Sequence, residues 1–127
     1  MKTGILSAGL LMVAGMTANA DVVDNLQASY RDSAANEFSA AAGQVLWQQA
    51  GKDQRRCAAC HGTDLSQPGE HATTHKVIRP MAPSVNNERL ADATKIEKWF
   101  LRNCKWTWGR ECSAQEKGDL LQYLRGL

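Results

Sequence analysis

The sequence has 127 residues, with 15 Lys and Arg against 13 Asp and Glu, and a formal net charge of +2. A chain of this length supports one domain with a modest core, and such a core gains much from a buried prosthetic group. The near balance of charge gives no basis for nucleic-acid binding.

The N-terminal segment is typical of a secretory signal. Lys2 is followed by the uncharged run GILSAGLLMVAGMT, and Ala18-Asn19-Ala20 has the small-x-small pattern that signal peptidase cleaves. We therefore expect residues 1–20 to be removed and residues 21–127 to form one mature domain in the periplasm. So short a run, with no second apolar stretch, predicts no stable membrane anchor.

Helical periodicity recurs in the mature part and strand-like alternation is nearly absent, which predicts a mostly α fold. We expect a short helix near residues 22–30 and a longer one from Ser33 to Ala50. Residues 62–87 carry two glycines and all three prolines, which indicates a long irregular segment wrapped around something. Thr94-Lys95-Ile96-Glu97 and Ser113-Ala114-Gln115-Glu116 have the form of capping boxes, so a helix is expected to begin at each.

The segment Cys57-Ala58-Ala59-Cys60-His61 is the most informative motif. Two thiols on adjacent turns can bond both vinyl groups of a haem, and the histidine that follows then lies beneath the iron. Two alternatives are a thioredoxin-like redox pair and a zinc site. The first lacks a βαβ setting and the second lacks a fourth ligand at regular spacing. We therefore predict one covalent haem c on Cys57 and Cys60, with His61 as the proximal ligand.

A second cysteine pair encloses the residues KWTWGRE. Outside the cytoplasm, a disulfide between Cys104 and Cys112 is the expected state of these two thiols. Closing a loop of about nine residues contributes ~2.6 kcal/mol to stability by the chain-entropy relation. The bond would also fix Asn103, which directly precedes it.

The ligand on the other face of the iron has several candidates, and spacing alone does not choose among them. Chemistry favours Met81, which is the one methionine of the mature part and lies between prolines in RPMAPS. Position favours Asn103, because only one predicted helix follows it, as is common for the distal ligand of small cytochromes. The full set is His71, His75, Lys76, Met81, Asn86, Asn87 and Asn103.

Three stretches carry a family resemblance: CAACHG, RPMAPS, and KIEKWFLRNCKWTWGREC followed by EKGDLL. With them the sequence resembles the sphaeroides haem protein (SHP) family, oxygen-binding monohaem cytochromes c of the class I fold. The resemblance implies an all-α domain around one haem, Asn103 as a labile sixth ligand, and a disulfide between Cys104 and Cys112. Gly43 and Trp47 are similar to the glycine and aromatic residue that cross the last helix in class I cytochromes.

The resemblance also implies what the protein does. We expect a periplasmic cytochrome that accepts electrons from a dihaem cytochrome c and binds oxygen, nitric oxide or a similar small ligand. Met81 stands where the family has an aliphatic residue, so an electron-transfer cytochrome with His61 and Met81 as ligands stays an alternative. A weak axial ligand favours binding, whereas two strong ligands favour electron transfer. Whether the protein is also an enzyme that reduces such a ligand is left open.

Overall fold

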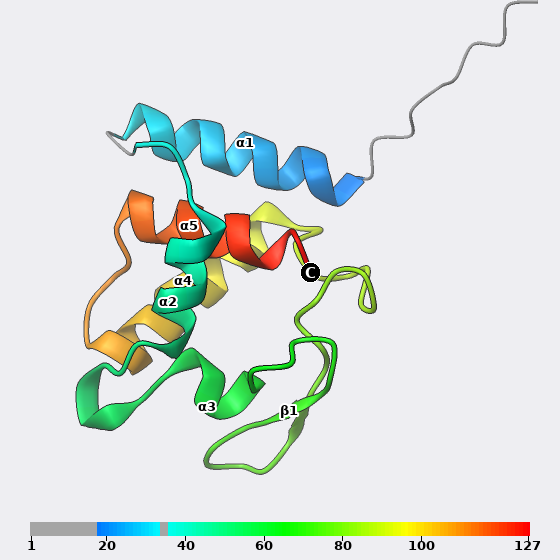
Figure 1. Ribbon diagram of the computed structural model, residues 1–127, viewed down its shortest axis with the longest axis vertical. Helices are drawn as coiled ribbons and strands as arrows, with labels where there is room; N and C mark the ends of the chain where they lie inside the picture. Colours follow the sequence, from blue (N-terminus) through cyan, green and yellow to red (C-terminus); the bar gives the residue numbers. More distant parts are fainter. Residues whose placement is uncertain (1–17, 34–35) are drawn as a thin grey trace, which may run out of the picture.

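The computed structural model describes residues 18–33 and 36–127, so residues 1–17 of the predicted signal lie outside the described part. Its elements are α1 (Ala18–Asp32), α2 (Ala40–Gln48), the 3₁₀ turn η1 (Lys52–Gln54), α3 (Cys57–His61), β1 (Gly69–Glu70), β2 (Val77–Ile78), α4 (Ala93–Trp108) and α5 (Ala114–Leu124). The expectation of a mostly helical fold is confirmed (Figure 1). Within the described residues, no helix has the length and apolar character needed to cross a membrane.

The crossing of α2 and α5 forms the centre of the fold, and no other pair of elements is packed so extensively. Gly43 permits the close approach, because a Cβ on it would lie 2.1 Å from the carbonyl oxygen of Asp119. One turn later the buried Trp47 meets Tyr123 edge to face, with 6.3 Å between ring centroids. The expected crossing of Gly43 and Trp47 over the last helix is confirmed.

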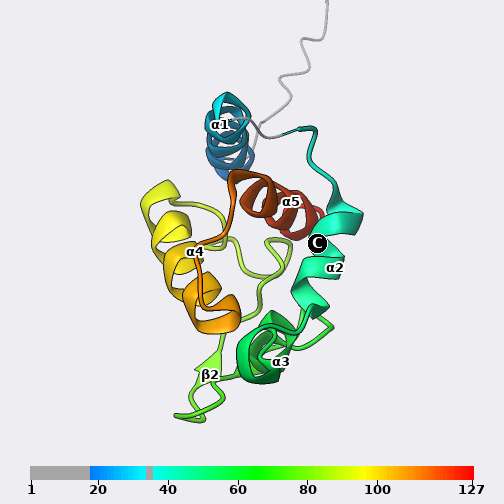
Figure 2. The same ribbon diagram turned by 90° about the vertical axis from the view of Figure 1, so that its left-hand side faces the viewer.

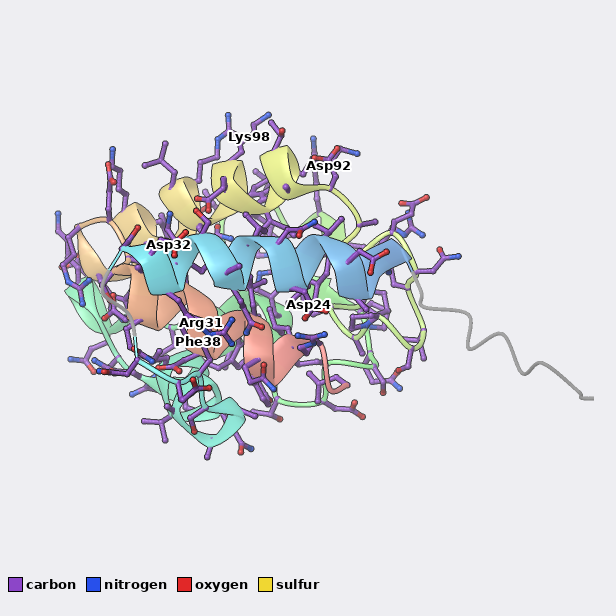
Figure 3. The ribbon with its side chains drawn as sticks, turned by 90° about the horizontal axis from the view of Figure 1, so that it is seen from above. Asp24, Arg31, Asp32, Phe38, Asp92 and Lys98 are labelled. Carbon is purple, nitrogen blue, oxygen red and sulfur yellow. A yellow bond between two sulfur atoms is a disulfide. The ribbon has the colours of Figure 1, made fainter. Side chains whose placement is uncertain are left out.

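Helix α1 lies across α5 (Figure 3), with Val23 and Tyr30 buried in the core cluster and polar contacts beside them. The buried Gln27 donates to the carbonyl oxygen of Gly118 at 3.1 Å, and Arg125 pairs with Asp24 at 2.7 Å. The Tyr30 hydroxyl donates to Glu97 on α4. The early helix expected near residues 22–30 is therefore present and is longer than predicted.

The helix predicted from Ser33 to Ala50 is wrong over residues 36–39, because α2 spans Ala40–Gln48; residues 34–35 lie outside the described part. Ser39 is the N-cap, and its side chain accepts a hydrogen bond from the amide of Ala42. Backbone amides of the preceding residues donate hydrogen bonds to side chains of α5 and not to carbonyls of their own segment. The Ser39 amide donates to Asp119, and the Asn36 amide donates to Gln115. Tertiary hydrogen bonds thus replace the helical ones.

The two predicted capping boxes have different outcomes. Ser113 and Glu116 form the predicted reciprocal pair at the start of α5. Thr94 does not cap α4, because Asp92 does so by accepting from the amide of Lys95 at 3.0 Å. Glu97 is drawn away from the helix end, since its carboxylate bonds Tyr30 and Lys117.

The segment from Gly62 to Asn87 is irregular, as expected, apart from one short hairpin. In it Gly69 pairs with Ile78 and Glu70 with Val77 in antiparallel register. Gly69 also crosses the end of α3, because a Cβ on it would lie 2.1 Å from the carbonyl oxygen of Cys60. The C-terminal end of α4 lies next to α3 in Figure 2. The irregular segment and α4 therefore both border the helix that carries the CxxCH motif.

Candidate haem site

Helix α3 holds the three residues of the motif in little more than one turn. Gly62 ends the helix with a positive φ of 77°, and its amide donates to the carbonyl of Ala58 at 2.8 Å. Cys57 and Cys60 are both free thiols. Across residues 18–33 and 36–127, no three His, Cys, Asp or Glu side chains gather in a way that would hold a metal ion, so the structure does not support the zinc alternative.

The imidazole of His61 is mostly buried and is supported by Trp47. Their ring centroids are 5.3 Å apart, and the indole nitrogen of Trp47 donates to the carbonyl oxygen of Gly62 at 3.1 Å. Burial, with a smaller contribution from the positive charge of Arg89, lowers the pKa of His61 to about 4. The ring is therefore neutral at pH 7, which is the form that binds iron.

Cys57 faces α4. Burial raises the pKa of its thiol to about 11, against a smaller opposing effect from a hydrogen bond with the side chain of Thr107. Thr107 is 1% exposed and lies in the last two turns of α4. It was not among the residues that the sequence suggested, because nothing in the motif indicates which part of α4 meets α3.

This contact bears on Asn103. Residues four apart share one face of a helix, so Asn103 and Thr107 lie on the same side of α4. The face that carries Asn103 is thus the one that meets Cys57 a turn later. The Asn103 side chain itself is exposed in the structure.

Met81 is half-buried and packs against the main core cluster, together with Cys57 and Ile96. Its amide and that of Ala82 both donate to the carbonyl oxygen of Leu65, at 3.0 and 2.9 Å. These bonds fix the RPMAPS segment close to the residues that follow α3.

The remaining candidates for the sixth position are engaged elsewhere or exposed. His71 accepts hydrogen bonds from the amides of Thr73 and Thr74 within the hairpin turn, and His75 contacts Glu70 at 2.8 Å. Asn86 is buried but donates to the carbonyl oxygen of Pro80 at 2.9 Å. Lys76 and Asn87 are exposed.

The second cysteine pair forms the expected bond. Cys104 and Cys112 are joined in a disulfide with a Cα–Cα distance of 5.6 Å, and both residues are buried. The bond links the last turns of α4 to the residues before α5. Its first cysteine, Cys104, directly follows Asn103.

The residues of α3 fit a covalently attached haem c. Both thiols are free to form thioethers, and the neighbouring imidazole is neutral. The Nδ1 atom of His61 is buried, and no described group forms a hydrogen bond with it.

Comparisons with known proteins agree with this site. Residues 33–124 match a family model described as a domain of unknown function (DUF1924). The cytochrome c-type protein SHP of Cereibacter sphaeroides is 39% identical over 94% of this chain and 94% of its own length. Cytochrome c'' of Methylophilus methylotrophus is 38% identical over 68 residues, which is 54% of this chain and 47% of that protein.

Solved structures give the same relatives. The structure of oxidized SHP, described as an oxygen-binding cytochrome c, has a TM-score of 0.76 and 35% identity, covering 83% of this chain and 96% of that one. Oxidized cytochrome c'' from Methylophilus methylotrophus has a TM-score of 0.72 and 28% identity, covering 83% and 94%.

Fold, motif and relatives together define a c-type cytochrome with the all-α class I fold and one haem c. More particularly, the chain belongs to the SHP family. The family resemblance of the sequence is therefore confirmed.

Proposed function

We propose that the protein is a periplasmic cytochrome that binds oxygen, nitric oxide or a similar small molecule at a haem iron held by His61 and a labile Asn103. The observation that carries this proposal is the match over 94% of the chain to SHP, whose solved structure is described as that of an oxygen-binding cytochrome c. The haem, when bound, supplies the iron and its one-electron chemistry.

The role of His61 follows from its surroundings. A neutral, buried imidazole presents its lone pair without first losing a proton. The Trp47 ring and the turn at Gly62 restrict its rotation. His61 is thus suited to be the permanent ligand on its side.

Asn103 is suited to be the ligand that leaves. A carboxamide is neutral and a weak ligand, so little binding energy is lost when it withdraws. Its position one turn from Thr107, which contacts Cys57, supports its placement toward the haem. The disulfide that begins at the next residue holds this turn of α4 to the loop before α5.

A second candidate is an electron-transfer cytochrome with His61 and Met81 as ligands. The packing of Met81 against the core cluster, which Cys57 also contacts, favours it. A thioether binds ferrous iron strongly, so this version would close the sixth position to small molecules.

Carbon monoxide distinguishes the two candidates. We expect ferrous holoprotein to take it up readily, with a shifted Soret band. Asn103→Ala is expected to change the ferric absorption spectrum, whereas Met81→Leu leaves it unchanged. Asn25→Ala, which removes an exposed amide on α1, is the matched control. Indifference to carbon monoxide, or a ferric spectrum that responds to Met81→Leu alone, would favour the second candidate.

We also propose that residues 1–20 direct export and are then removed, and that a dihaem cytochrome c supplies electrons. The apolar run and the small residues at 18 and 20 support export. The mass of the purified holoprotein tests it, since the expected mature chain begins at Asp21 and carries one haem. Stopped-flow mixing with a reduced dihaem cytochrome c tests the donor.

A further inference from the structure

We propose that the surface around Cys57 is a docking site for an acidic redox protein. This inference rests on the proposed function, because it takes Cys57 to bear the haem. The surface consists of Trp106 and five basic residues of the η1 loop and the C-terminal half of α4, which we call the basic rim: Lys52, Arg55, Arg56, Arg102 and Lys105.

Two segments distant in sequence build the basic rim. The loop around η1 is pressed against the end of α4, because a Cβ on Gly51 would lie 2.1 Å from the carbonyl oxygen of Thr107. Arg55 crosses this junction: its Nη1 donates to the carbonyl oxygen of Trp106 at 3.1 Å, and its guanidinium lies 4.8 Å from the Trp106 ring centroid. Figure 2 shows the end of α4 beside α3. The η1 loop and the end of α4, which carry the basic rim, are therefore packed together.

The charge of the basic rim is strongly one-sided. Its nearby carboxylates are Asp53, 3.6 Å from Arg55, and Glu111, 3.5 Å from Lys105. Five cations against two carboxylates leave three positive charges here, whereas the whole chain has a formal net charge of only +2. The basic rim thus carries an excess of positive charge next to Cys57 in the chain.

The basic rim also has the composition of an interface. Trp106 is 37% exposed, and Arg55 and Lys105 have side-chain exposures of 36% and 55%. Tryptophan and arginine are enriched among residues that dominate binding energy, and the stacked Arg55 is ordered before any partner arrives. An exposed indole with cationic side chains near it is complementary to a partner protein whose surface is acidic around an apolar centre.

The location suits electron transfer. Arg56 directly precedes Cys57, so a partner seated on the basic rim lies against the residue that bonds the haem. Electron-transfer complexes are small and short-lived, and opposite charges raise their association rates by about 10- to 1,000-fold at low ionic strength. A few uncompensated charges on the surface next to Cys57 are therefore sufficient for such a complex.

Flavodoxin hydroquinone, an acidic one-electron donor, is a suitable probe. Mixed with ferric holoprotein, it gives one electron to the iron and becomes the semiquinone. We expect Lys52→Glu with Lys105→Glu to slow this reduction about tenfold at an ionic strength of ~20 mM, and the difference to shrink to within about twofold at ~0.5 M. Lys52→Gln with Lys105→Gln removes the two charges without reversing them and should give an intermediate rate. This pair serves as the test variant if the reversed pair does not fold with haem.

Two controls isolate the charge effect. Lys95→Glu with Lys98→Glu makes the same charge change at the opposite end of α4, away from α3, and should stay within about twofold of the unaltered protein. Neutral riboflavin semiquinone delivers one electron and releases its proton to the buffer. It carries no acidic surface, so its rate should be equal for all variants.

The proposal is overturned if both charge-reversed pairs slow flavodoxin equally, or if the rate of the unaltered protein does not fall as the salt concentration is raised. It is also overturned if riboflavin semiquinone slows as much as flavodoxin, because the change then lies in the haem. Carbon monoxide uptake by the same proteins reports on the proposed function separately, since it does not depend on docking.

Discussion

The contact at Gly43 allows a quantitative prediction. In Gly43→Ala, the new methyl group would lie 2.1 Å from the carbonyl oxygen and 2.7 Å from the carbonyl carbon of Asp119. Ordinary contacts of this kind are longer than 3.4 Å, so α2 and α5 must separate by about an ångström. The obstacle is backbone in a buried helix, and no flexible side chain can yield instead.

The magnitude follows from two opposing effects. Overpacking of this kind costs up to about 3 kcal/mol, and replacing glycine by alanine inside a helix returns about 1 kcal/mol. We therefore expect Gly43→Ala to lower the free energy of unfolding by about 2 kcal/mol, with a fall in Tm of about 10 °C for a domain of this size. Trp47 lies one turn later, so the His61 environment should be disturbed as well.

Thermal unfolding of the holoprotein, followed by far-ultraviolet circular dichroism and Soret absorbance, measures both effects. Gln44→Ala changes the exposed neighbouring position and is the control. A Gly43→Ala protein as stable as the unaltered one would show that the crossing of α2 and α5 can relax freely, and the reasoning would be wrong.

Two further predictions concern stability. Cys104→Ala with Cys112→Ala should lower the free energy of unfolding by ~2.6 kcal/mol in urea titrations, since the nine-residue loop is no longer closed in the unfolded chain; a loss below about 1 kcal/mol would contradict this. Glu116 has a lowered pKa, chiefly through its hydrogen bonds from Arg110, so its contribution is present above its unfolded pKa and is lost as the pH falls through the folded one. Glu116→Gln should therefore destabilise the protein at pH 7 by about 1 kcal/mol or less and have no such effect near pH 2, and equal losses at both would refute the assignment.

Local signals in the sequence were sufficient where the responsible atoms are close along the chain. The capping box at Ser113 and Glu116 needs only four residues, and it was predicted correctly. The motif from Cys57 to His61 is likewise contained in one short helix. The crossing at Gly43 was anticipated through the family resemblance, because its partner Asp119 is far away in sequence.

Predictions failed where a distant group competed for the same atoms. Glu97 has the spacing of a capping residue, but Tyr30 and Lys117 bind its carboxylate, so Asp92 starts α4 instead. Ser39 could have been helical, yet Asp119 takes its amide. The contact of Thr107 with Cys57 and the basic rim depend on how η1 meets α4, which no local pattern reveals.

The indole of Trp47 has a wider consequence for maturation. It bridges the ring of His61 and the edge of Tyr123, which lies on α5. A polypeptide truncated before α5 would keep Cys57, Cys60 and His61, the predicted haem-binding residues, yet the indole behind the His61 imidazole would lose its contact with Tyr123. The position of the predicted iron ligand therefore depends on α5 being folded against α2.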